Sequence, residues 1–479
     1  MADSQTPSTR SSGAPGTVRG MATNTLQRPR ASATRPAPAA AGPDSGHALI
    51  RVLLVAGVLA ITGLWWVGTP ASAGSTPGTG LLAIGELAGL QASFLVLAQL
   101  LLVARVPWFE RAVGFDRLVS WHRSLGTTVV LLVVGHVAAM IGGAMLIDHS
   151  TPWGEVGTLL TTTPKMLSAI IGAAIFLVVG LSSARLLRRR LSYEVWFVIH
   201  LLTYGGIYLA FGHQIAAGVH FVDSPLARAA WIGLYAATGL AVVWWRFLKP
   251  LVDNARAGLR VDAVRAEATG TTSVWLRGRD LHKFGARGGQ FFLLRFVAAG
   301  HLVTAHPYSM SLTPRGDRVR FTIGMLGDHS RSVAHLAPGT RVLVEGPFGR
   351  FTSDRARSPR VLLVAGGVGI GPVRALAEEL VAAGRDVVVL HRAHSIDRLA
   401  LGREFPESSL LHYVPLTGRR AQLGYDPLAP ANLRSLVPDV ASRDVFVCGP
   451  PAMIDAVART AHTLGVPRRA IHHEELSLS

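Results

Sequence analysis

The sequence is poor in cysteine and in charged residues. Its one cysteine, Cys448, excludes a disulfide framework, a cysteine-ligated zinc site and a cysteine-held iron–sulfur cluster within this chain. Charged residues make up 16% of the 479 positions, whereas soluble proteins average about 25%. Hydrophobic residues reach 49%, and the mean hydropathy is +0.36. These figures argue against a purely soluble protein.

Acidic residues are also scarce, with 29 Asp and Glu against 47 Lys and Arg, so the formal net charge is +18. Such an excess is typical of nucleic-acid-binding proteins, but also of the cytoplasmic side of membrane proteins. No recognised nucleic-acid-binding module is present, and many arginines lie in the N-terminal tail or between apolar runs. We therefore expect the partner surface to be a lipid bilayer and not a nucleic acid.

Composition divides the chain into four segments. Residues 1–46 are rich in Ala, Pro, Ser, Thr and Gly, which predicts a disordered tail. Residues 47–249 hold six apolar runs of about 20 residues, the length of a transmembrane helix; they lie at 48–68, 81–104, 118–142, 165–184, 194–216 and 226–248. The remainder, 250–356 and 357–479, has the composition of soluble domains.

Basic residues are unevenly shared among the connections between the runs. The second-to-third and fourth-to-fifth connections hold seven arginines, whereas the other three hold only Lys165; the arginines are Arg105, Arg111, Arg117, Arg185, Arg188, Arg189 and Arg190. Because positive loops stay in the cytoplasm, the pattern predicts a multi-pass protein of the cell membrane with both termini cytoplasmic.

The soluble half changes its pattern near residue 357. Before that point, short β-rich runs alternate with Gly/Pro turns, which favours a small antiparallel barrel; the runs are 272–276, 290–296, 318–323 and 341–345. After it, the strand-like runs 361–365, 386–390 and 445–448 alternate with helix-like stretches such as 373–383. This alternation predicts an α/β domain with a parallel sheet.

Only four histidines lie well inside the apolar runs, His122 and His136 in the third and His200 and His213 in the fifth. At 1.5 Å per residue, the gaps of 14 and 13 residues span about 21 and about 19.5 Å. The third and fifth runs cross in the same direction, so the histidines can face each other as two pairs. Two stacked haems with two imidazole ligands each would fit; polar residues that bond across helices are the alternative.

The helical angles fit the third run better than the fifth. A gap of 14 residues returns to within about 40° of the same face, whereas 13 residues miss it by about 140°. We therefore expect the fifth helix to bend at Gly205-Gly206, to carry a π-bulge, or to present its two ligands from different sides.

These paired spacings, followed by a soluble module, resemble the ferric reductase/NADPH oxidase superfamily. The resemblance covers about residues 48–479 and implies a six-helix haem bundle, a ferredoxin-reductase-like FAD barrel and an NAD(P)-binding α/β domain. It assigns His122 and His200 to the inner haem and His136 and His213 to the outer one.

The resemblance extends to flavin motifs. His306-Pro307-Tyr308-Ser309, read as the end of a strand-like stretch, resembles the Arg-x-Tyr-Ser motif, in which the aromatic ring packs on the flavin and the serine bonds its N5 edge. The segment 323–331 resembles the pyrophosphate loop, which opens a short helix, and implies binding by Ile323, Gly327, Ser330 and Arg331. Gln290 matches a barrel strand of the family, in a flavin-binding or a purely structural role, and 345–349 matches the turn that ends the barrel.

A glycine-rich turn after the strand 361–365 resembles the dinucleotide loop of the same family. It consists of Gly366, Gly367, Gly369, Gly371 and Pro372, with Pro372 suited to the first helical position. Cys448, Gly449 and Pro450 match the motif beside the nicotinamide; a small buried residue is the other reading of Cys448. Arg392 and Ser395 follow the strand at which the family binds the adenosine ribose. The resemblance implies that they bind a 2′-phosphate, which favours NADPH slightly over NADH.

The implied activity is electron transfer from cytoplasmic NAD(P)H through FAD and two b-type haems to an external acceptor. Ferric iron is the first candidate acceptor and oxygen, reduced to superoxide, the second. A haem-binding membrane subunit that serves a partner protein or senses dinucleotides is the alternative of another class. One departure concerns the C-terminus, where relatives often place an aromatic residue on the flavin and this chain offers Leu476 or Leu478.

Overall fold

The computed structural model describes residues 44–301, 304–406 and 408–475. The predicted tail, up to residue 43, lies outside these ranges. So do Leu476 and Leu478, so the expectation that one of them covers the flavin has no structural counterpart here.

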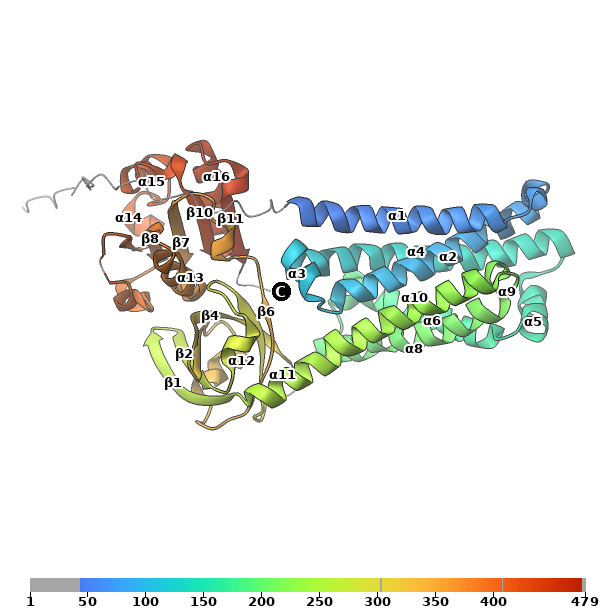
Figure 1. Cartoon of the computed structure of the whole chain (residues 1–479), viewed down its shortest axis with the longest axis horizontal. Helices are drawn as coiled ribbons and strands as arrows, with labels where there is room; N and C mark the ends of the chain where they lie inside the picture. Colours follow the sequence, from blue (N-terminus) through green and yellow to red (C-terminus); the bar gives the residue numbers. More distant parts are fainter. Residues whose placement is uncertain (1–43, 302–303, 407, 476–479) are drawn as a thin grey trace, which may run out of the picture. The chain divides into compact units, whose positions relative to one another are not determined.

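Six helices in the described part of the chain are long and apolar enough to cross a membrane, which makes this a multi-pass membrane protein. They run side by side (Figure 1) and correspond one by one to the predicted runs; they are α1 (Asp44–Gly68), α2 (Pro77–Val103), α4 (Phe115–Asp148), α6 (Met166–Ser183), α8 (Tyr193–Ala217) and α10 (Pro225–Val242).

Short helices in the connections were not visible as apolar runs. They are η1 (Ala71–Gly74), α3 (Pro107–Val113), α5 (Pro152–Thr162), α7 (Arg185–Arg188) and α9 (Val219–Val222). Helix α5 starts where the Thr151 side chain accepts the Gly154 N–H, a local cap that hydropathy does not detect. Helix α10 continues through a π-helical turn, η2 (Val243–Leu248), into α11 (Lys249–Ala257).

The first soluble domain is a six-stranded antiparallel sheet in the order β1-β2-β5-β4-β3-β6, as predicted for the barrel. Its strands are β1 (Arg260–Ala268), β2 (Thr271–Arg277), β3 (Phe291–Phe296), β4 (His306–Arg315), β5 (Arg318–Gly324) and β6 (Val342–Phe348). Its short helices are η3 (Leu281–Phe284), α12 (Asp328–Ser332), η4 (Val333–His335) and η5 (Ser353–Arg355). Its main apolar core includes Phe292, Met310 and Phe321, and a smaller cluster joins Phe291 and Leu293 of β3 to Phe348 of β6.

The second soluble domain is a five-stranded parallel sheet in the order β11-β10-β7-β8-β9. Its strands are β7 (Arg360–Gly366), β8 (Asp386–Ala393), β9 (Leu411–Thr417), β10 (Asp444–Gly449) and β11 (Ile471–Glu475). Its helices are η6 (Gly367–Gly369), α13 (Ile370–Ala382), η7 (Ile396–Arg398), η8 (Gly402–Glu404), α14 (Arg420–Leu423), α15 (Pro430–Leu436), η9 (Val440–Ser442), α16 (Pro451–Thr463) and η10 (Arg468–Ala470).

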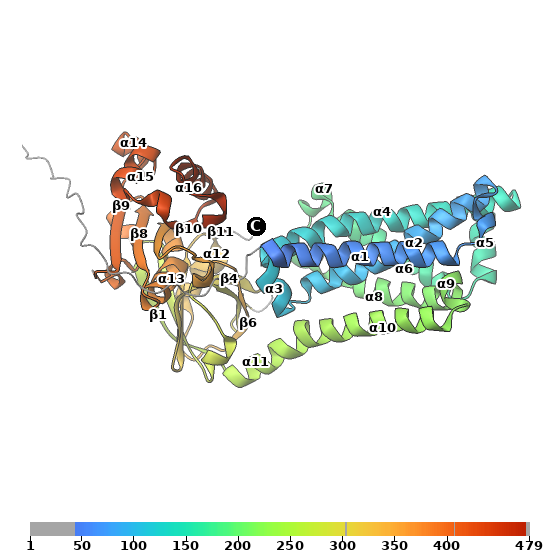
Figure 2. The same ribbon diagram turned by 45° about the horizontal axis from the view of Figure 1, so that its top comes forward.

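Both faces of this sheet are buried, which explains why β7 reads as a continuous apolar run. Val361 and Leu363 pack with α13, whereas Leu362 and Val364 pack with α15 and α16 on the opposite face (Figure 2). Strand β7 lies in the middle, between β8 on one side and β10 on the other. The chain therefore reverses its direction of sheet building at β7, and such a reversal leaves a ligand crevice at the carboxyl ends of the strands.

Two local expectations were wrong. The His306-Pro307-Tyr308-Ser309 motif begins strand β4 and does not end a strand. A proline near the first position of a strand is tolerated because little of the ladder precedes it. Pro372 is the third residue of α13, which starts at Ile370, and not the first.

Candidate functional site

The four membrane histidines lie on two helices whose backbones are kept apart. His122 and His136 belong to α4, and His200 and His213 to α8. Helix α4 packs along α2, and α8 packs along α6, whereas α4 and α8 share hardly any close backbone contacts in the described residues. Helices α4 and α8 therefore meet through side chains, as His122 and His200 do.

The backbone of α2 orients both histidines of α4. The ring nitrogen Nδ1 of His122 lies 3.2 Å from the carbonyl oxygen of Gln99, and Nδ1 of His136 lies 2.7 Å from that of Gly85. The two carbonyl groups are as far apart in sequence as the two histidines, because α2 and α4 run antiparallel. A bond from Nδ1–H to a carbonyl leaves Nε2 as the free lone pair, and this arrangement is common for metal-ligating histidines.

Close approach of α2 to His136 depends on Gly89. A Cβ at this position would lie 2.8 Å from Nδ1 and 3.0 Å from Cε1 of the His136 ring. Neither the orienting carbonyl groups nor Gly89 was identified from the sequence, because backbone acceptors carry no side-chain signature. Only the packing of two helices reveals them.

The residues present fit haem ligation at the first pair. The ring centroids of His122 and His200 lie 6.0 Å apart. Two imidazoles on opposite sides of one iron, with metal–nitrogen bonds of about 2 Å, place their ring centres about 6 Å apart. In addition, Nδ1 of His200 is buried and has no hydrogen-bond partner in the described residues. Stacking against Trp196, with ring centroids 5.1 Å apart, holds that ring instead.

The second pair, His136 and His213, lies close enough for its members to interact electrostatically. Helix α8 is α-helical from Tyr193 to Ala217. The predicted π-bulge is therefore wrong for this helix, and a bend or an approach of the two ligands from different sides remains to account for their spacing.

In the barrel, the predicted flavin residues gather around the start of β4. His306 and Tyr308 share this region with His329 of α12: the His306 and His329 ring centroids lie 3.7 Å apart, and the Tyr308 hydroxyl lies 3.3 Å from His329 Nδ1. His301, which the sequence reading did not single out, lies 2.8 Å from His329 Nε2 through its own Nδ1. Burial together with the nearby His306 and His301 lowers the pKa of His329 to about 4.

The predicted pyrophosphate loop does open a short helix, α12. The Gly327 N–H donates to Ser330 Oγ at 2.9 Å, and the Ser330 hydroxyl lies 2.9 Å from the Gly327 carbonyl oxygen. Arg331 pairs with the Asp328 carboxylate at 2.7 Å. Ile323 is buried in the barrel core, and Pro307 pairs with Leu293 of β3.

Ser309 pairs with Phe291, so Tyr308 and Ser309 point to opposite sides of the strand. The side chain of Gln290 accepts the Arg287 N–H at 2.9 Å and donates to the Gly349 carbonyl at 3.2 Å. Gln290 thereby joins β3 to the turn that ends the barrel, a structural task.

In the α/β domain, the glycine-rich turn lies at the carboxyl ends of β7 and β10. A Cβ at Gly369 would lie 2.3 Å from the Cys448 carbonyl oxygen, and one at Gly449 would lie 3.1 Å from Gly366 Cα. Gly367 has a φ of +55°. The predicted residues Gly366, Gly367, Gly369 and Gly371 therefore form a backbone-lined edge together with Cys448, Gly449 and Pro450, suited to close approach by a pyrophosphate.

His391, missed by the sequence reading, supports this turn from below. Its Nε2 lies 3.3 Å from the Gly367 carbonyl oxygen, and its Nδ1 lies 2.9 Å from the Tyr413 hydroxyl. Burial lowers the pKa of His391 to about 4, so the ring is neutral near pH 7. The side chain of Cys448 is fully buried, and burial together with Glu474 raises the pKa of its thiol.

At the carboxyl end of β8, Arg392 is held by backbone carbonyls. Its guanidinium donates to Ala393 at 2.7 Å, to Leu416 at 2.9 Å and to Gly418. Ser395 hydrogen-bonds to the Asp397 carboxylate, whose pKa is lowered by that bond and by one from Thr269. The two predicted residues therefore lie at one edge of the sheet, each already engaged by the protein.

The predicted flavin and nucleotide regions lie against each other. A Cβ at Gly324 would lie 3.1 Å from Val368, and one at Gly371 would lie 3.6 Å from Thr322. Strand β5, which leads into the predicted pyrophosphate loop, therefore contacts the glycine-rich turn directly.

Comparisons with known proteins match different parts of the chain. A family model described as ferric reductase like transmembrane component matches residues 88–211, which include His122, His136 and His200; His213 lies two residues beyond the matched range. The electron transfer subunit of dihydroorotate dehydrogenase B (NAD(+)) from Listeria monocytogenes is 27% identical over 176 residues, 36% of this chain and 67% of that protein. The ferredoxin reductase component of 3-ketosteroid-9-alpha-monooxygenase from Rhodococcus rhodochrous is 28% identical over 232 residues, with coverages of 45% and 64%.

Among solved structures, a ferredoxin NADP+ reductase from Neisseria gonorrhoeae with bound FAD and NADP aligns with a TM-score of 0.39 at 17% identity, over 46% of this chain and 100% of that one. The chain spans about two thirds of the length of the two curated relatives.

Proposed function

We propose that this chain, which joins a ferric reductase-like transmembrane component to a ferredoxin reductase-like FAD/NAD(P) module, is an oxidoreductase that carries electrons from NAD(P)H across the membrane. The observation that carries the proposal is the set of four histidines, paired at two depths between α4 and α8, in one chain with a glycine-lined nucleotide edge. When bound, FAD converts a hydride into single electrons, and haem iron passes them on one at a time.

In the membrane, His122 and His200 would hold the inner haem, and His136 and His213 the outer one. The carbonyl groups of Gln99 and Gly85 fix the rings of His122 and His136 through Nδ1, which leaves Nε2 of each ring available as a ligand. Fixed ligand rings support electron transfer because little rearrangement is then needed when the charge on the iron changes.

In the barrel, Tyr308 and Ser309 would contact the flavin as catalytic residues, and His306 and Pro307 would line its site. Ile323, Gly327, Ser330 and Arg331 belong to the loop proposed to hold the pyrophosphate. Here Arg331 contributes positive charge, and His306, whose ring lies beside that of His329, offers a ring N–H donor to phosphate oxygens.

In the α/β domain, the glycine edge would receive the pyrophosphate of the nicotinamide nucleotide, with Cys448, Gly449 and Pro450 near the nicotinamide. We propose NADPH as the preferred donor. Arg392, held at the sheet edge by three carbonyl groups, supplies a fixed positive charge for a 2′-phosphate, with Ser395 beside it.

The arginine-rich connections support a cytoplasmic location for both termini and the soluble module, so the electrons leave on the outer side. Ferric iron is the acceptor we propose first. Superoxide formation from oxygen is the second candidate, and a haem-binding subunit that serves a partner protein is the candidate of another class.

The test is an anaerobic visible spectrum of the purified, detergent-solubilised protein with FAD, before and after NADPH. The proposal predicts two haems per chain whose bands shift to the reduced form in step with NADPH oxidation. Re-oxidation by a ferric chelate, and its rate relative to oxygen, then ranks the acceptors. If dithionite reduces the haem but NADPH and NADH do not, the result would favour the haem-binding subunit that serves a partner protein. A folded protein without haem would refute the assignment of the four histidines.

A further inference from the structure

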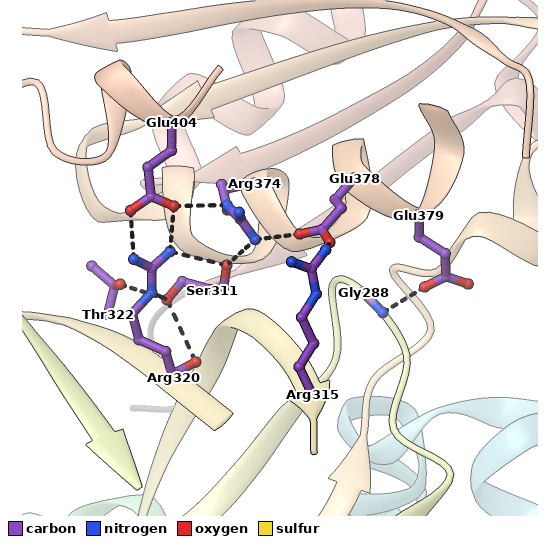
Figure 3. A network of polar contacts seen from close by, with 9 residues as sticks. All are labelled: Gly288, Ser311, Arg315, Arg320, Thr322, Arg374, Glu378, Glu379 and Glu404. Carbon is purple, nitrogen blue, oxygen red and sulfur yellow. Dashed lines mark hydrogen bonds and ion pairs between the residues drawn. The ribbon is translucent and has the colours of Figure 1, made fainter. Parts of the chain in front are cut away.

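A partly buried cluster of charges joins the flavin barrel to the nucleotide domain (Figure 3). Arg320 of β5 is only 3% exposed and makes two bonds to the Glu404 carboxylate, one of them Nη2 to Oε2 at 2.8 Å. Arg374 of α13 donates to the same carboxylate from Nε at 2.9 Å. Two arginines from different domains therefore share one carboxylate.

On the flavin side, this cluster rests on the strands that carry the flavin motifs. Ser311, two residues after Ser309 on β4, accepts hydrogen bonds from Arg320 Nε at 2.9 Å and from the Thr322 hydroxyl at 2.7 Å. Its carbonyl accepts one from Arg374 at 3.3 Å. Thr322 directly precedes the segment proposed to hold the flavin pyrophosphate. A displacement of the cluster would thus be felt at both flavin motifs.

On the nucleotide side, the cluster holds both ends of the proposed dinucleotide site. Arg374 lies two residues after Pro372, in the first turns of the helix that follows the glycine-rich turn. Glu404 is the last residue of the segment 395–404, which begins at Ser395. This segment contacts the barrel at a second point, because the Thr269 N–H donates to the Asp397 carbonyl at 2.9 Å.

Neighbouring contacts make the α13 junction a close one. The Gly288 N–H donates to Glu379 of α13 at 2.7 Å, and a Cβ at Gly288 would lie 2.4 Å from the Ala375 carbonyl oxygen. Glu378 bonds to both Arg374 and Arg315 at the rim of the cluster. Apolar contact alone would let the two domains slide, whereas directional bonds between these partly buried charges fix one arrangement.

We propose that Arg320, Glu404 and Arg374 are positioning residues that set the distance and angle at which the nicotinamide meets the flavin. The inference rests on the proposed function, because it concerns hydride transfer from NADPH to FAD. These residues lie outside the motifs proposed to hold the two cofactors; they act through Ser311, Thr322 and the start of α13. A displacement of about 1 Å at reacting atoms can slow a reaction about 100-fold.

The test uses Glu404→Gln in the full-length protein, with Asp317→Asn as the matched control. Asp317 also pairs with an arginine of the module, Arg277 at 3.2 Å, but both partners are exposed. Anaerobic stopped-flow measurement of flavin reduction by NADPH, and by NADPH deuterated at the transferred position, gives the hydride-transfer rate and its isotope effect.

We expect Glu404→Gln to slow flavin reduction about 10- to 100-fold, with an undiminished isotope effect, a weaker nicotinamide–flavin charge-transfer band, and a Kd for NADPH and an FAD content close to those of the unaltered protein. The control should match that protein throughout. A normal rate and charge-transfer band in Glu404→Gln would overturn the inference.

A second variant separates positioning from stability. Arg320→Met combined with Glu404→Leu replaces the pair of buried Arg320 and half-buried Glu404 by apolar side chains, an exchange that often restores stability. We expect the thermal unfolding temperature to recover while hydride transfer stays slow; recovery of both would show a merely structural role. If NADPH fails to reduce the flavin of the unaltered protein, the proposed function fails. If NADPH reduces the flavin of the unaltered protein and of the variants at the same rate, this inference alone fails.

Discussion

Replacing Gly89 by alanine should remove the outer haem and leave the inner one in place. The added Cβ would lie 2.8 Å from Nδ1 of His136, whereas unstrained contacts begin near ~3.5 Å. The ring must therefore move by about 0.7 Å. Its bond to the Gly85 carbonyl, now 2.7 Å, would then exceed the ~3.2 Å limit of a good hydrogen bond.

Loss of such an orienting bond lowers metal affinity by about 10- to 100-fold, equal to about 1.4–2.7 kcal/mol. Alanine favours a helix by about 1 kcal/mol over glycine, so the loss cannot come from a weaker α2. Gly142→Ala is the control, because a Cβ at that position of α4 meets nothing within 4 Å.

The assay is the haem-to-protein ratio of the purified variants, together with a reductive titration that resolves the two haems. We expect Gly89→Ala to fall from two haems toward one and to keep the absorbance of the inner pair, while Gly142→Ala keeps both. Two haems with an unaltered spectrum in Gly89→Ala would refute the assignment of His136 and the role of α2.

Three further predictions concern the soluble module. His391 has a pKa of about 4 in the folded protein and an ordinary pKa of 6.5, so between these values only the unfolded chain binds the proton. Acidification from pH 6.5 to 4 should therefore lower the unfolding free energy of the nucleotide domain by about 3 kcal/mol. His391→Asn should reduce this pH dependence, measured by hydrogen exchange of the β8 amides. Arg443 is fully buried and bonded to Asp439. Arg443→Ala should therefore lower the unfolding free energy of the full chain by about 3–5 kcal/mol, whereas Arg360→Ala, at an exposed position, should lower it by less than ~0.5 kcal/mol. Arg392→Ala should raise the Kd for NADPH about tenfold or more and leave that for NADH unchanged in equilibrium titrations.

The membrane bundle and both soluble sheets could be predicted because their signals are strong and local. Six apolar runs of the right length correspond to six helices, and the uninterrupted Val361–Ala365 run becomes a strand buried on both faces. Strands β1, β9 and β11 were missed because their burial is mixed, so neither alternation nor a continuous apolar run marks them.

The site could be predicted only where side-chain identity carries the chemistry. The four histidines stand out because ionisable residues in a membrane span are costly. The groups that orient these histidines do not stand out in the sequence. The Gln99 and Gly85 carbonyl groups are backbone atoms, and Gly89 matters only because it leaves room for the His136 ring. The Arg320–Glu404 pair was equally invisible, since its partners are 84 residues apart and charged residues are usually read as surface.

Electron transfer across a sealed membrane tests the central claim most directly. The full-length protein is reconstituted into vesicles with FAD, NADPH is added on the side of the soluble module, and an impermeant ferric chelate is enclosed on the other. The account predicts reduction of the enclosed chelate, and it predicts that His136→Ala stops this reduction while NADPH still reduces the flavin. An enclosed chelate that stays oxidised while the unaltered protein consumes NADPH, or that His136→Ala reduces at the unaltered rate, would contradict it.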